Sequence, residues 1–149
     1  MKNYFVKGAL ALVASVGLAS CGSDPTNMGT EPTDLVANKI SGSVREWGID
    51  VSAAKAKSGV VTFAIANFGT ISHEFIVVKT NFPLGEIPIG KNNRFDEDGE
   101  GVEAVDEIAE FEVDTTHVLK VMLEPGAYQL LCNIAGHYKN GMYAALTVS

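Results

Sequence analysis

Three residues with metal-binding side chains follow one another at equal spacing near the end of the chain. Cys132, His137 and Met142 form the pattern C-x4-H-x4-M on a segment between two expected strands. Thiolate and thioether sulfur are soft donors that suit Cu(I), whereas imidazole also accommodates Cu(II). Zinc sites usually present paired ligands at C-x2-C or H-x3-H spacing, and the sequence contains neither. The donor set therefore favours copper.

Three ligands require a fourth, and the chain has only two further histidines. His73 stands at the start of an expected strand, within residues 67–75. A sandwich can bring the start of that strand beside the end of the strand that leads to Cys132. We therefore predict His73 as the fourth ligand. His117 begins a strand with alternating residues, matches no ligand position and is predicted to be structural.

The elements that must position these ligands are short strands, because from residue 39 onward the hydrophobic period is close to two. Strand-like runs are expected at residues 44–51, 60–67, 75–79, 111–113, 117–123, 127–132 and 142–148. Their number and spacing predict an all-β antiparallel sandwich or barrel. The only helix that we expect is one short helix within residues 101–110.

The N-terminus resembles an export signal with a lipid-attachment site. Lys2 and Lys7 precede a short apolar run, and residues 18–21 (Leu-Ala-Ser-Cys) resemble the lipobox of bacterial lipoproteins. We predict a cleaved signal at 1–20, a lipidated Cys21 with a tether at 21–38, and one domain at 39–149. An ordinary signal peptide that contains a cysteine, and a disulfide between Cys21 and Cys132, are the alternatives.

Two segments carry a resemblance to the cupredoxins, the small blue copper proteins. Residues 67–75 read N-x-G-x3-H-E-F, and residues 125–142 read P-G-x-Y-x3-C followed by the ligand pattern. The ligand spacing is similar to that of rusticyanin, auracyanin and sulfocyanin. The resemblance implies a Greek-key β-sandwich with one type 1 copper ion, held in a plane by His73, Cys132 and His137. Met142 would be the weak axial ligand.

The resemblance also draws attention to residues around the ligands. Many cupredoxins have Asn or Ser directly after the first histidine, where this chain has Glu74. Groups near a metal ligand tune the metal. We therefore expect Glu74, Asn133 and Asn67 to affect the reduction potential.

In the cupredoxins the C-terminal histidine is the usual entry point for electrons. Here His137 is flanked by the uncharged residues Ile134, Ala135 and Tyr138, so we expect its ring edge to reach an apolar surface. These four residues form the predicted electron-transfer surface.

The charge of the chain is strongly acidic. Its net charge is −7, and the first 20 residues contribute two lysines and no acid. Such a surface repels nucleic acid, which excludes that class of partner. Ten acids and no base lie within residues 96–114: Asp96, Glu97, Asp98, Glu100, Glu103, Asp106, Glu107, Glu110, Glu112 and Asp114. Three interpretations are open for these acids: a solvated loop, a surface that steers a basic partner, or a calcium site at residues 96–100. The last of these fits no EF-hand pattern.

The sequence favours an electron carrier of the bacterial cell envelope over a copper storage, delivery or resistance module. Methionine-rich or histidine-rich tracts would favour the module, and the chain has none. Multicopper enzymes need further domains and histidines, so we expect no substrate turnover. The expected partners are redox proteins, such as a c-type cytochrome or a membrane oxidase or reductase. The expected location is the periplasmic or outer-membrane face, with the lipid as the membrane contact.

Overall fold

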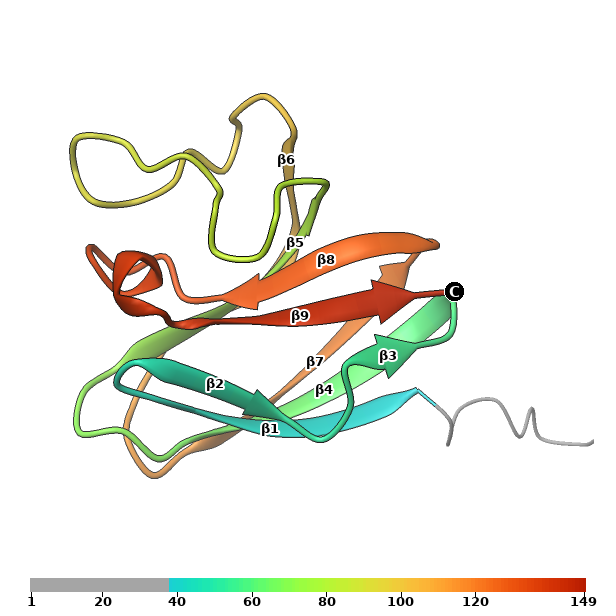
Figure 1. Cartoon of the computed structure of the whole chain (residues 1–149). Helices are drawn as coiled ribbons and strands as arrows, with labels where there is room; N and C mark the ends of the chain where they lie inside the picture. Colours follow the sequence, from blue (N-terminus) through green and yellow to red (C-terminus); the bar gives the residue numbers. More distant parts are fainter. Residues whose placement is uncertain (1–37) are drawn as a thin grey trace, which may run out of the picture. The chain divides into compact units, whose positions relative to one another are not determined.

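The computed structural model describes residues 38–149, which fold into two packed β-sheets (Figure 1). The described strands are joined by short turns, apart from two long connections: residues 81–101 between β5 and β6, and residues 132–142 between β8 and β9. Their bounds are β1 Lys39–Arg45, β2 Gly48–Val51, β3 Lys55–Ala56, β4 Gly59–Asn67, β5 His73–Thr80, β6 Val102–Phe111, β7 Thr116–Leu123, β8 Gly126–Leu131 and β9 Tyr143–Val148. A 3-10 turn, η2, covers Tyr138–Asn140. The expected all-β sandwich is confirmed.

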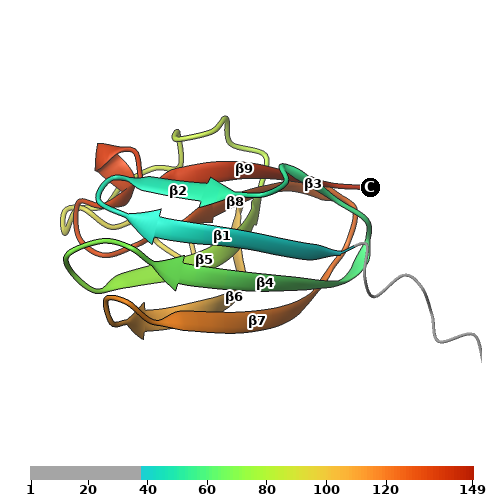
Figure 2. The ribbon, with the colours of Figure 1, turned by 90° about the horizontal axis from the view of Figure 1, so that it is seen from below.

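The two sheets are mixed, whereas the sequence predicted antiparallel pairing. One sheet has the order β2-β1-β4-β7 and the other the order β3-β9-β8-β5-β6 (Figure 2). The pairs β1–β4 and β3–β9 are parallel. The reason is the route of the chain: after β2 it crosses to the second sheet as β3. It then enters β4 from the same end of the sandwich as β1.

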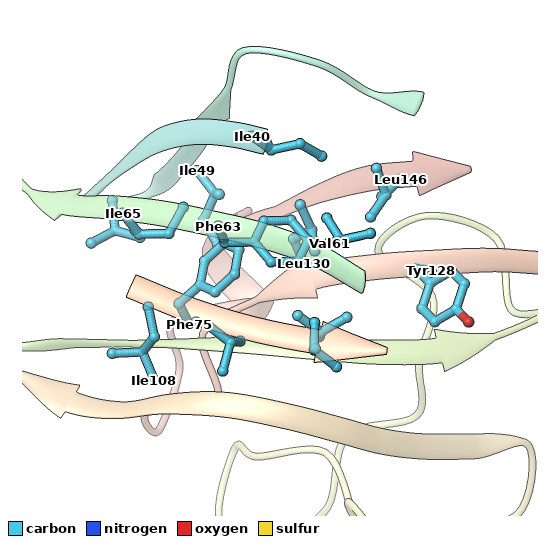
Figure 3. Close-up of a cluster of buried hydrophobic side chains, with 14 of the residues drawn as sticks. Ile40, Ile49, Val61, Phe63, Ile65, Phe75, Ile108, Tyr128, Leu130 and Leu146 are labelled. Atoms are coloured by element: carbon cyan, nitrogen blue, oxygen red, sulfur yellow. The ribbon is translucent and has the colours of Figure 1, made fainter. Parts of the chain in front are cut away.

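Alternating side chains of both sheets fill the core between them (Figure 3). In β4 the buried positions are Val61, Phe63, Ile65 and Asn67, at the strand period of two. The ring of Phe63 packs at 5.4 Å from that of Phe75 in the opposite sheet. The polar exception is Asn67, which lies at the end of β4 beside the predicted ligands.

Strand β5 is buried on both faces because residues 81–101 cover its outer side. Its consecutive residues Phe75, Ile76, Val77 and Val78 are all buried. Such a continuous apolar run is typical of a strand that is covered on both sides. The outer-facing residues of β5 form a second small core with residues of the covering segment, of β8 and of η2: Ile76, Val78, Ile87, Phe95, Leu131 and Tyr138. We call residues 81–101 the covering loop.

Three local predictions were wrong. The run 111–113 is not a strand of its own, because Phe111 ends β6 and a turn follows it. Residues 102–111 form strand β6 instead of a short helix, because pairing with β5 outweighs the helix propensity of their Ala and Glu residues. The run 44–51 is not one strand: a turn at Glu46 and Trp47 divides it into β1 and β2, which pair as a hairpin.

The signal at 1–20, the lipidated Cys21 and all but the last residue of the predicted tether lie outside the described residues, so they remain predictions. Within residues 38–149, no helix is long and apolar enough to cross a bilayer.

Candidate metal centre

The four predicted ligands lie at element ends on one pole of the sandwich. His73 is the first residue of β5, and Cys132 directly follows β8. His137 precedes η2, and Met142 precedes β9. Two backbone hydrogen bonds close the loop between them: Cys132 N donates to Met142 O and Met142 N donates to His137 O, each at 3.2 Å. We call this end the ligand pole.

The donor atoms of three of these residues converge. His73 Nδ1 and His137 Nδ1 lie 3.3 Å apart, and Cys132 Sγ lies 3.3 Å from His137 Nδ1. One ligand atom from each residue lies within 4.8 Å of the other two. The two imidazoles thus face each other through Nδ1, and that of His137 also faces the sulfur. Met142 is fully buried and packs in the same core cluster as Cys132.

Burial decides the protonation of these groups in the metal-free protein. It lowers the pKa of His73, which the neighbouring His137 lowers further, and it lowers the pKa of His137. Burial also raises the pKa of the Cys132 thiol to about 11. The site therefore holds two neutral imidazoles and a thiol at neutral pH. Because a bound metal needs the thiolate, metal binding releases a proton.

Glu74 joins the strands that carry His73 and Cys132. Its backbone N–H donates to Cys132 Sγ at 3.3 Å, and its carboxylate accepts from the backbone N–H of Asn133 at 3.2 Å. Burial raises the pKa of this carboxyl, while the Arg94 guanidinium, 3.7 Å away, opposes that rise. The sequence had predicted a role for Glu74 near the ligands, but it gave no sign of Arg94.

The covering loop holds the ligand loop from outside. Asn133 accepts from Phe95 N at 3.0 Å and donates to Glu97 Oε1 at 2.8 Å, and Gly136 N donates to Asn93 O at 2.9 Å. The segment from Cys132 to Met142 is thus fixed by contacts with a distant part of the chain. This rigidity is what a preorganised metal site requires.

Asn67 lies in the connection that leads to His73. Its side chain accepts from Gly69 N at 2.9 Å and donates to Ile71 O and Phe111 O, at 2.9 and 3.1 Å. It therefore shapes the segment before the ligand. Within residues 38–149 no hydrogen bond joins its side chain to a ligand side chain, although Asn67 Oδ1 and His73 Nε2 both border the space beside Gly69.

The surface at the ligand pole differs from the prediction. Tyr138 is 1% exposed, so it is not part of an electron-transfer surface. Its ring lies in the second core because its hydroxyl bonds Ile87 N and Gln129 Oε1, both at 3.0 Å. His137 itself is only 5% exposed. The ring of Trp47, which is half-exposed, meets it edge-on with ring centroids 5.3 Å apart.

The remaining sequence predictions concern groups away from the ligands. His117 lies exposed on β7, and its ring packs 5.2 Å from Phe111, outside the metal-binding cluster. The acids of residues 96–114 fall on the end of the covering loop, on edge strand β6 and on the turn after it. Exposed charges on an edge strand hinder pairing with other chains.

A comparison with known protein families covers the ligand pole and most of the strands that position it. The model of the sulfocyanin (SoxE) domain matches residues 49–149. The chain belongs to this family. The matched range includes all four predicted ligands and begins within β2, so it leaves out β1, the β1–β2 turn and Gly48. Family membership and the buried donor cluster together establish a cupredoxin with a single type 1 copper site.

Solved structures show the same fold at low identity. Auracyanin from Roseiflexus castenholzii is 20% identical over 75% of this chain and 97% of its own, with a TM-score of 0.55. Rusticyanin from Thiobacillus ferrooxidans is 16% identical over 74% of this chain and 76% of its own, with a TM-score of 0.55. Azurin isoform 2 from Methylomonas sp. strain J is 12% identical over 74% and 97%, with a TM-score of 0.54. No curated protein matches the chain.

Proposed function

We propose that this sulfocyanin domain carries single electrons through its copper site and turns over no substrate. The observation that carries the proposal is the convergence of two imidazole Nδ1 atoms and one thiol sulfur in a buried cluster. Copper supplies the redox chemistry there by alternating between Cu(I) and Cu(II). The chain's part is to hold soft and borderline donors in one geometry that serves both oxidation states.

Within this proposal His73, Cys132 and His137 would be the strong ligands of the copper, and Met142 would be a weak one. The thiolate and the two imidazoles match the trigonal donor set of blue-copper sites, for which an axial methionine is typical. The buried ligand side chains keep water from the metal. A copper storage or delivery module must instead release its metal, and the bonds between the covering loop and the ligand loop oppose such opening.

We propose that electrons enter at the ligand pole, where Trp47 covers His137 and Ala135 is exposed. The partner would be a basic redox protein, such as a c-type cytochrome or a membrane oxidase or reductase. The acids of residues 96–114 would guide its approach, which is an effect that salt screens. Export and lipid attachment at Cys21 would place this exchange at the cell envelope.

The test is the optical spectrum of the protein loaded with Cu(II), compared with that of the Cys132→Ser variant. We expect an intense thiolate-to-copper band in the wild type and none in the variant, because serine supplies no soft anionic donor. A wild type that binds only Cu(I) and stays colourless would support storage or delivery. A variant that keeps the band would refute the ligand assignment.

A further inference from the structure

The β1–β2 turn brings a carboxylate next to the first histidine of the cluster. Glu46 Oε1 accepts hydrogen bonds from Thr70 N, Thr70 Oγ1 and Ile71 N, at 2.7, 3.0 and 3.1 Å. The same oxygen lies 3.8 Å from His73 Nε2. Hydrogen bonding by its own backbone N–H and by that of Thr70 lowers the pKa of Glu46 to about 2, so the group is a carboxylate at neutral pH.

His73 Nε2 is the one buried side-chain nitrogen or oxygen in residues 38–149 that has no hydrogen-bond partner. Its Nδ1 faces His137 Nδ1, which leaves Nε2 as the ring's other nitrogen, on the side of Glu46. A neutral imidazole that offers Nδ1 to a metal carries its proton on Nε2. A buried N–H without an acceptor destabilises the fold by about 1–3 kcal/mol, so the Nε2–H of His73 requires a hydrogen-bond acceptor.

Gly69 keeps the space beside Nε2 open. A Cβ atom at this position would lie 2.7 Å from His73 Nε2 and 2.9 Å from Glu46 Oε2. The imidazole nitrogen and the second carboxylate oxygen therefore border the same small gap. Any side chain at residue 69 would enter that gap, which explains the glycine of the N-x-G-x3-H pattern in physical terms.

We propose that Glu46 is a positioning residue of the copper site, which accepts the Nε2–H of His73 and so directs Nδ1 toward the metal. The 3.8 Å separation must shorten by about 1 Å to become a hydrogen bond. The carboxylate has a second effect, because an acceptor on the far nitrogen makes a ligating imidazole a stronger donor. This inference rests on the proposed role of His73 as a ligand.

The apoprotein tests this proposal without copper. In protein with 15N-labelled histidine, long-range 1H–15N spectra show which ring nitrogen of His73 carries the proton. We expect Nε2–H in the wild type and in Glu46→Gln, whose amide oxygen can still accept. In Glu46→Ala we expect a mixture of the Nε2–H and Nδ1–H tautomers of His73. Without the carboxylate, either ring can hold the proton that lies between His73 Nδ1 and His137 Nδ1.

Two variants control for other effects of Glu46. Thr70→Val removes one bond that Glu46 makes to the connection before His73, and Asp50→Asn removes a charge of the same hairpin that pairs with Arg45. Both should keep the wild-type tautomer. Gly69→Ala places a methyl group in the gap and should reproduce the effect of Glu46→Ala, so it serves as the test if Glu46→Ala does not fold.

Copper binding supplies the second readout. Loss of an outer hydrogen-bond partner typically weakens metal binding about 10- to 100-fold, so we expect that loss in Glu46→Ala and much less in Glu46→Gln. If Glu46→Ala and Gly69→Ala keep both the wild-type tautomer and the wild-type copper affinity, Glu46 only fastens the 70–71 backbone and the proposal is wrong. Absence of the thiolate band in the wild type would instead overturn the proposed function.

Discussion

The Tyr138→Phe substitution tests whether this residue fastens the covering loop, as its burial indicates, or serves electron transfer. In the wild type Ile87 N donates to the Tyr138 hydroxyl, which donates to Gln129 Oε1. Phenylalanine keeps the ring packing but leaves Ile87 N without a partner, whereas Gln129 Oε1 still accepts from Gly85 N at 3.2 Å. One buried unsatisfied donor costs about 2 kcal/mol of unfolding free energy. For a domain of this size that loss lowers Tm by about 8 °C.

Urea unfolding of the apoprotein, followed by circular dichroism, measures the free-energy change. Tyr143→Phe is the matched control, because its ring packs 5.3 Å from that of Tyr138 but is partly exposed. We expect the control to change stability by less than about 0.5 kcal/mol. The electron self-exchange rate of the copper form should be the same in both variants and the wild type. A Tyr138→Phe protein of wild-type stability with slower self-exchange would refute the reasoning.

The remaining predictions concern the copper centre and its surface. Met142→Leu should raise the reduction potential and Met142→Gln should lower it, because an oxygen donor favours Cu(II); voltammetry measures both. Arg94→Gln should lower the potential, because it removes the positive charge that faces the Glu74 carboxylate and thereby favours Cu(II). Ala135→Lys should slow electron exchange even at high salt, where the Debye length falls below 10 Å; an unchanged rate would place the entry point elsewhere. Burial lowers the pKa of His73 below 6.5, so the unfolded apoprotein binds more protons. Apoprotein stability should therefore fall as pH drops below about 6.5, as urea titrations at several pH values can show.

The candidate ligands could be selected from the sequence because their signals are local. Cys132, His137 and Met142 share one loop between two strands, and the alternating pattern located both strands. His73 followed from the start of another strand, since a sandwich gathers strand ends at its poles. Only residue types and a period of two were needed for these inferences.

The surroundings of the ligands were not predictable in the same way. Glu46 and Trp47 escaped notice because their turn lies inside a run that reads as one strand, and Gly48 was the only local sign of a break. The contact of Arg94 with Glu74 depends on how the covering loop folds back over β5. Tyr138 was predicted at the surface because it is one of the uncharged residues that flank His137, whereas Ile87, which donates to its hydroxyl, lies far away in the sequence.

The direction of β1 determines at which end of the sandwich the preceding chain joins the domain. Asn38, held by two hydrogen bonds with Lys57, leads into β1 at the end of the sandwich opposite the ligand pole (Figure 1). With a lipid on Cys21, as we propose, the domain would be attached to the membrane through the end opposite the ligand pole. The ligand pole would then be free to face the aqueous side. The 17 residues from 22 to 38 span at most about 60 Å. A partner would then reach the ligand pole from the aqueous side and not at the lipid surface. Its distance from the membrane would be at most the length of the tether plus the length of the domain.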